Sequence, residues 1–155
     1  MFIKTKYFGE INLEEDKVIE FPQGIMGFEG YNKYTLLHDI EEGGKPMISW
    51  LQCVEEPDLA IPVMNPLFVK ADYNPTVEDA LLSLLGEIND ENALVLVTIT
   101  VPADKTKVTV NLKAPFVINS DTRKGCQIIV ENSDYPVKYN IYEVIREMKE
   151  AKEGE

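Results

Sequence analysis

The sequence predicts a mostly-β fold: a single compact antiparallel barrel-like or sandwich domain with one short internal helix and a C-terminal helix. Hydrophobic residues alternate with a period of two along most of the chain, as in half-buried strands. Roughly eight or nine short apolar runs are separated by turn-forming residues, which is typical of barrels and sandwiches. A length of 155 residues suits one domain with a self-sufficient core. We therefore expect a barrel-like domain over residues 1–135 and a C-terminal helix or tail over residues 136–155.

The first elements are two strands and a glycine-rich turn. Residues 2–8 alternate in hydrophobicity, with Lys4 and Lys6 on one face, and residues 17–21 form a second short run. Three glycines lie between Gly24 and Gly30. Glycines at this density indicate backbone with positive φ or a close approach of two chain segments. We expect Gly24 and Gly27 to set the geometry of a turn.

Three strands are expected next, at residues 34–38, 48–54 and 59–64. Pro62 lies within the third of them. Because proline has no N–H to donate to a neighbouring strand, its position indicates a strand at a sheet edge or a bulge.

The internal helix is predicted to begin after Pro75. Thr76 can cap the helix, while Glu78 and Asp79 complement the positive end of the helix dipole. Gly86 supplies a C-terminal stop. The apolar face of this helix consists of Leu81, Leu82, Leu84 and Leu85.

Strands resume in the C-terminal half. Residues 94–101 form a nearly continuous apolar run, which predicts a central strand covered on both faces. Residues 107–113 alternate, and the side chains predicted to point inward are Val108, Val110 and Leu112. Residues 116–119 and 126–131 complete the set of strands, with a polar turn between them.

The C-terminal helix is predicted from apolar residues that recur at helical spacing after Pro136. These residues are Ile141, Val144, Ile145 and Met148. The pattern indicates an amphipathic helix that frays into the charged last residues.

Negative charge is concentrated in the middle of the chain. Residues 46–104 contain ten acidic side chains and one basic one, Lys70, so this stretch holds −9 of the net charge of −12. A concentrated negative field attracts basic proteins and repels nucleic acid. The sequence therefore favours a surface that docks a cationic protein over one that binds RNA or DNA. The alternative is that the acids only keep a small domain soluble.

The residue types that usually carry enzymatic chemistry are sparse. There is one histidine, His38, and the two cysteines, Cys53 and Cys126, lack the spacing of metal ligands. No nucleophile elbow, P-loop or dinucleotide-binding motif occurs. We therefore expect no catalytic residue, no metal and no cofactor. The acids at 55–58 could be recruited as a carboxylate pair of a hydrolase, but their place beside Pro57 is more typical of an acidic turn.

The chain is expected to work in the cytoplasm. The first residues lack the apolar run of a secretory signal, and no apolar run approaches the ~18 residues needed to span a bilayer. Without a secretory signal, the two cysteines are expected to be buried, reduced thiols. Oligomeric state is not specified by the sequence, and a monomer is favoured.

Three blocks of residues resemble one known family. The early block is Phe21-Pro22-x-Gly24-x-x-Gly27-Phe28-Glu29; the middle block is Trp50-Leu51-Gln52 followed by Pro57-Asp58-Leu59-Ala60; the late block is Thr109-Val110-Asn111-Leu112-x-Ala114-Pro115 with Gly125-x-Gln127. In order and spacing these blocks are similar to the flagellar assembly factor FliW family. The resemblance implies a non-enzymatic, barrel-like cytoplasmic protein. It also implies that the protein binds flagellin before export and antagonises the translational repressor CsrA, which couples flagellin synthesis to export.

Two sets of residues are expected to carry these interactions. The acidic set, predicted to dock CsrA, is Glu55, Glu56, Asp58, Asp72, Glu78 and Asp79. The apolar set beside Pro62 and Pro66, predicted to bind flagellin in a groove, is Ile61, Met64, Leu67, Phe68 and Tyr73. The alternative for the acids is a solvated surface, and the alternative for the apolar residues is core packing. We expect the two motif blocks around Gly24 and Asn111 to serve as scaffold, with Asn111 satisfying backbone groups at a strand end.

A third class of function is a β-barrel that binds a small molecule. It would need a closed interior cavity of several hundred Å³. The large side chains of residues 94–101 predict a filled interior instead.

Overall fold

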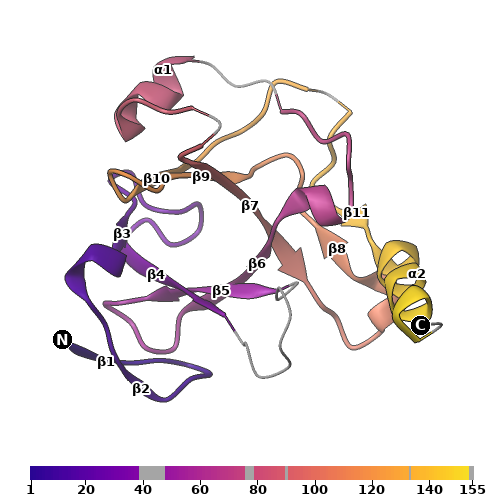
Figure 1. The fold of residues 1–155 in the computed structure, drawn as a ribbon, viewed down its shortest axis with the longest axis horizontal. Helices are drawn as coiled ribbons and strands as arrows, with labels where there is room; N and C mark the ends of the chain where they lie inside the picture. Colours follow the sequence, from indigo (N-terminus) through magenta and orange to yellow (C-terminus); the bar gives the residue numbers. More distant parts are fainter. Residues whose placement is uncertain (39–47, 76–78, 90, 133, 154–155) are drawn as a thin grey trace.

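The computed structural model describes residues 1–38, 48–75, 79–89, 91–132 and 134–153, and it confirms a mostly-β domain with a C-terminal helix (Figure 1). The strands are β1 (Phe2–Lys4), β2 (Glu10–Asn12), β3 (Ile19–Glu20), β4 (Lys33–His38), β5 (Ser49–Cys53), β6 (Ala60–Met64), β7 (Ala93–Thr100), β8 (Thr109–Val110), β9 (Phe116–Asn119), β10 (Lys124–Gln127) and β11 (Tyr139–Asn140). The helices are α1 (Asp79–Leu82) and α2 (Tyr142–Glu153), with short 3₁₀ turns η1 (Glu15–Lys17), η2 (Pro66–Phe68), η3 (Ser83–Leu85) and η4 (Lys105–Lys107).

Strand pairing closes the sheet into a barrel. One sheet runs in the order β11-β8-β7-β6-β5-β4-β3-β10-β9, and β7 also pairs with β9. That additional pairing closes a ring from β7 through β6, β5, β4, β3, β10 and β9, while β8 and β11 extend outside it. The pairings are antiparallel, as predicted, with one exception: β10 meets β3 in parallel at Lys124 and Glu20.

The barrel interior is filled by side chains. Phe21 stands edge-on to Tyr34, with ring centroids 5.4 Å apart, and to Phe116, at 5.9 Å. The other buried members of this cluster are Ile19, Ile25, Leu51, Cys53, Ile61, Val63, Leu96 and Ile118. A ring of this size has an interior just wide enough for its own side chains. The packing therefore favours the predicted filled interior over a ligand cavity.

β7 is the central strand that the sequence predicts, and it is covered on both faces. Leu94 and Leu96 pack in the barrel interior, whereas Val97 and Ile99 pack in a second cluster outside the barrel. The second cluster also contains Val108, Val110 and Leu112, the three side chains predicted to point inward. Alternation along one strand thus supplies two cores.

The C-terminal helix α2 docks against this second cluster. Ile141 is fully buried there, and Val144 and Ile145 of α2 pack against the cluster as partly buried residues. Figure 1 shows α2 beside β8 and β11, at the opposite side of the molecule from β1 and β2. The side chain of Met148 lies outside the described residues. The division at residue 135 stays a prediction.

The predicted strand at residues 2–8 is wrong in its second half. β1 ends at Lys4 and the chain turns back into β2, which pairs with β1 in antiparallel orientation. The hydroxyl of Thr5 donates to the Gly9 carbonyl at 2.7 Å and accepts from the Phe8 amide at 2.9 Å. Gly9 adopts a positive φ of 66°. This local turn outweighs the alternation that continues through it.

The prediction of an edge strand or bulge at Pro62 is also wrong, because β6 lies between β5 and β7. Trp50 is the partner of Pro62 across β5. Since the Cys53 amide donates to the Leu59 carbonyl at 2.9 Å, the alternation of the ladder makes Trp50 and Pro62 a non-hydrogen-bonded pair. The missing N–H of Pro62 therefore removes no bond to β5.

The predicted strand at residues 126–131 corresponds to β10, which begins two residues earlier and ends at Gln127. Two further predictions concern the 107–113 strand and the internal helix. β8 is only two residues long, because the side chain of Asn111 accepts from the amides of Lys113 (3.0 Å) and Ala114 (3.1 Å). Asn111 thus satisfies backbone groups at a strand end, as predicted.

The internal helix is confirmed as α1 and η3, and it ends at Gly86 with a φ of +85°. Thr76 and Glu78 lie outside the described residues.

Candidate docking site

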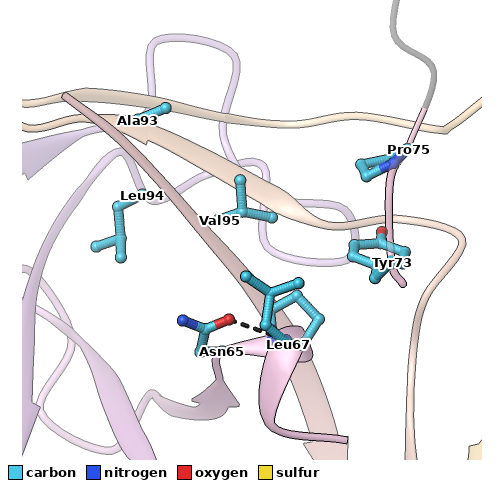
Figure 2. A pocket seen from close by; sticks show the side chains of 8 residues that line it. Asn65, Leu67, Tyr73, Pro75, Ala93, Leu94 and Val95 are labelled. Atoms are coloured by element: carbon cyan, nitrogen blue, oxygen red, sulfur yellow. Dashed lines mark hydrogen bonds between the residues drawn. The ribbon is translucent and has the colours of Figure 1, made fainter. Parts of the chain in front are cut away.

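A pocket of about 190 Å³ lies between η2 and the first half of β7 (Figure 2). It is lined by Asn65, Pro66, Leu67, Tyr73, Pro75, Ala93, Leu94 and Val95. Apart from the Asn65 amide and the Tyr73 hydroxyl, these side chains are apolar. An apolar concavity of this size suits a single side chain of a protein partner, whereas drug-sized ligands need ≈ 300 Å³ or more.

The rim of the pocket is built by η2. Asn65 precedes the turn, and its side-chain oxygen accepts a hydrogen bond from the Leu67 amide at 2.9 Å, drawn as a dashed line in Figure 2. Pro66 takes the first position of the turn, where its missing N–H costs nothing. The turn buries Pro66 and leaves Leu67 53% and Phe68 39% exposed. Two large apolar side chains therefore stand in solvent beside an apolar pocket.

Tyr73 fixes the wall of the pocket that faces the C-terminal part of the chain. Its hydroxyl donates to the Leu112 carbonyl at 2.7 Å, and its ring lies 4.7 Å from that of Tyr135. Tyr135 in turn accepts a hydrogen bond from the Asn74 amide at 2.9 Å. Burial raises the pKa of Tyr73, so its hydroxyl stays protonated and keeps donating.

The structure divides the apolar residues predicted for flagellin binding. Leu67 and Phe68 are exposed, and Leu67 and Tyr73 line the pocket. Ile61 is buried in the barrel interior, and Met64 is buried in the second cluster. For Ile61 and Met64 the structure therefore fits the alternative of core packing, and their side chains are not available to a partner.

Three of the predicted acids share the turn between β5 and β6. The buried side chain of Gln52 organises this turn: its amide nitrogen donates to the carbonyls of Cys53 (3.0 Å), Pro57 (3.0 Å) and Leu59 (3.2 Å). Glu55 accepts from the amides of Asn32 (2.9 Å) and Lys33 (3.0 Å) and so ties the turn to β4. Glu56 and Asp58 complete the acidic group on this turn.

The fourth acid, Asp72, lies in different surroundings. Its carboxylate is 3.1 Å from the ammonium of Lys70, and this contact holds the pKa of Asp72 below its ordinary value. Lys70 also lies 5.7 Å from the Tyr139 ring and 6.0 Å from the Tyr135 ring. The structure therefore places Asp72 beside β11, away from the acids of the β5–β6 turn. Glu78 and the side chain of Asp79 lie outside the described residues.

The remaining titratable side chains have structural surroundings. His38 Nδ1 is 2.6 Å from the Ser49 hydroxyl, and burial lowers the pKa of this histidine. Cys53 and Cys126 are free, buried thiols, as predicted, and burial raises the pKa of Cys126 to about 11. A thiol with a raised pKa is a poor nucleophile at neutral pH. Within the described residues, no three His, Cys, Asp or Glu side chains gather closely enough to hold a metal ion.

The glycine loop, predicted to serve as scaffold, also carries exposed apolar side chains. Met26 and Phe28 of that loop face solvent. The available signal was the position of two large apolar residues between glycines, where a purely structural turn would place polar ones.

Comparisons with known proteins give the same family over nearly the whole chain. A family model described as "FliW protein" matches residues 2–141. A protein named "Flagellar assembly factor FliW" from Lachnoclostridium phytofermentans is 50% identical over 155 residues, which cover 100% of this chain and 99% of the relative. One of the same name from Thermotoga neapolitana is 37% identical over 98% of each chain.

A solved structure gives the same result for the fold. It is titled "Crystal structure of the flagellar assembly factor FliW" and aligns with a TM-score of 0.82 at 31% identity, over 91% of this chain and 96% of that chain. Among the described helices, none has the length and apolar character needed to cross a bilayer.

Proposed function

The chain belongs to the FliW family of flagellar assembly factors, and from this premise we propose that it binds flagellin in the cytoplasm and antagonises the repressor CsrA. Through these two interactions it couples flagellin synthesis to export. The protein acts by presenting contact surfaces, with no bond made or broken.

The pocket beside η2 is the proposed site for flagellin. The observation that carries this assignment is the exposure of Leu67 and Phe68 on a turn fixed by Asn65, next to an apolar concavity. Amphipathic helices dock through apolar anchors spaced at i, i+3 and i+4, and a pocket of this size would receive one such anchor. Tyr73 and Val95 would contact the anchor, while Leu67 and Phe68 would cover it.

The acidic residues are proposed to dock CsrA. RNA-binding proteins carry basic surfaces, which an acidic surface complements. Glu55, Glu56, Asp58, Asp72, Glu78 and Asp79 remain the candidate set, although Asp72 is separate from the first three. Antagonism follows if CsrA held by this protein no longer reaches its RNA.

Titration calorimetry with purified flagellin and purified CsrA, each alone and then in competition, tests the proposed function. We expect both to bind, and we expect flagellin to release CsrA. Leu67→Ser/Phe68→Ser should weaken flagellin binding by roughly tenfold or more, since buried apolar anchors dominate interface energies. Val101→Ser, a change of an exposed residue outside the pocket, is the matched control. A sample that binds neither protein would refute the proposal.

A further inference from the structure

The loop between β3 and β4 presents two apolar side chains to solvent at one end of the barrel. Met26 is 48% exposed and Phe28 is 41% exposed. They lie on either side of Gly27, whose φ is +89°. The η2 pocket does not include either residue.

The loop that carries them is held tightly. The Gly24 amide donates to the Phe21 carbonyl at 2.8 Å, and the Phe28 amide donates to the Ile25 carbonyl at 2.7 Å. Ile25, which lies between Gly24 and Met26, is buried in the barrel interior. Because these hydrogen bonds already hold the backbone, the loop would lose little backbone freedom when a partner binds.

A third exposed apolar side chain belongs to the same end of the barrel. The Met26 amide donates to the side-chain oxygen of Gln127 at 2.9 Å. The amides of Ile128 and Val130 donate to the carbonyls of Pro115 and Lys113, which continues the ladder of β9 and β10. Gln127 and Ile129 therefore point to the same side, about 7 Å apart along the strand. Ile129 is 49% exposed.

The segments that carry this apolar group, and the turn that is hydrogen-bonded to them, are acidic. Three segments meet at this end: residues 22–32, the turn at 54–59, and residues 127–132. Glu55 bonds to the amides of Asn32 and Lys33, which joins the first two segments, and Gln127 joins the first and third. These segments contain no lysine or arginine, and their acids are Glu29, Glu55, Glu56, Asp58 and Glu131. Lys33 and Lys113 flank the segments, and Lys113 Nζ lies 3.4 Å from the Asn132 carbonyl.

We propose that Met26, Phe28 and Ile129, with this acidic rim, form a second docking surface for a basic protein that offers an apolar anchor. The inference rests on the proposed function, within which it assigns this surface to the RNA-binding repressor and leaves the η2 pocket to flagellin. Apolar contacts supply affinity at the centre, and the surrounding carboxylates orient a basic partner.

The test compares Met26→Ser/Phe28→Ser with the control Leu84→Ser, which alters an exposed residue on η3, outside the three segments of the proposed surface. Calorimetry with purified CsrA and with purified flagellin measures both affinities, and thermal unfolding verifies the fold. We expect the double variant to bind CsrA at least tenfold more weakly and flagellin within twofold of the wild type. The control should bind both proteins as the wild type does.

Ile129→Ser tests the same surface from outside the loop, in case the double variant loses its cooperative unfolding transition. Folded variants that bind CsrA within twofold of the wild type would overturn the proposed surface. Loss of flagellin binding in place of CsrA binding would overturn its assignment to a basic partner. A wild-type protein that binds neither partner would refute the proposed function itself. This outcome differs from failure of the proposed surface, in which the wild type and the variants all bind CsrA.

Discussion

The side-chain oxygen of Gln127 accepts a hydrogen bond from the Met26 amide at 2.9 Å, although the two residues are 101 positions apart in the chain. The side-chain nitrogen of Gln127 donates to the Ala114 carbonyl at 3.2 Å. One glutamine thus links the glycine loop to the segment that Asn111 shapes. Two blocks that are separate in the sequence form one structural unit at the end of the barrel.

Gln127→Leu should loosen this unit while leaving the fold intact. The variant loses both hydrogen bonds, and because the site is near solvent we expect a cost of about 1 kcal/mol in unfolding free energy. Amide hydrogen exchange, measured by NMR, should become faster at Met26. Gln23→Leu changes an exposed glutamine of the same loop and should leave the Met26 exchange rate unchanged.

Gly24→Ala should destabilise the protein more than Gly27→Ala. Both glycines have positive φ, but a Cβ at Gly24 would lie 2.8 Å from the Glu29 Cα and 2.9 Å from the Glu29 carbonyl oxygen. A Cβ at Gly27 would meet nothing within 4 Å. We expect a loss of about 1 kcal/mol from the backbone conformation at Gly27 and about 3 kcal/mol at Gly24, where a backbone clash adds to it. Urea denaturation measures both, and equal losses would contradict the predicted clash.

The free energy of unfolding should fall above pH 9, and part of this fall should come from Cys126. Burial raises the pKa of this thiol to about 11, from an ordinary value of 9.0. Between these values the folded protein retains a proton that the unfolded chain releases, so stability is complete below pH 9 and declines as the pH rises toward 11. The decline attributable to Cys126 should reach about 2 kcal/mol.

Comparison with Cys126→Ala isolates this contribution, because other titrating groups are common to both proteins. The difference in unfolding free energy between wild type and variant should shrink from pH 8 to pH 11. A constant difference over that range would show that the thiol does not titrate as described.

Charge reversals should separate the two acidic regions. Glu56→Lys/Asp58→Lys should slow association with CsrA at low salt and reduce its salt dependence, since exposed charges act mainly on encounter. Asp72→Lys, beside β11, and Glu78→Lys/Asp79→Lys test the other members of the set. Stopped-flow association rates at two ionic strengths provide the measurement. If every variant keeps the rate and salt slope of the wild type, CsrA does not use these acids.

Alternation in the sequence predicted most strands because local burial reflects local pattern. β4, β5 and β9 lie where alternating or apolar runs placed them, and β7 has two covered faces as its continuous apolar run indicated. Predictions failed where a local turn or the pairing of distant strands outweighs the alternation of apolar and polar residues. Thr5 and Gly9 turn a long alternating run into a hairpin, and strand pairing leaves Pro62 inside the sheet.

The candidate site was predictable only in part. Pro66 drew attention to Leu67 and Phe68, which are exposed. Ile61 and Met64 have the same apolar character and adjacent positions, yet they are buried, because exposure depends on how β6 packs between its neighbours. The exposed loop residues Met26 and Phe28 could not be separated from scaffold without knowing that Ile25, which precedes Met26, points inward.

The parallel contact of Lys124 with Glu20 has a consequence for how the ring assembles. Every other junction of the ring has at least two residue pairs, whereas this one has a single pair between segments about a hundred positions apart. Joining distant segments costs chain entropy before contacts repay it. We therefore expect the β3–β10 junction to be the last of the ring to pair during folding and the first to open in native-state hydrogen exchange.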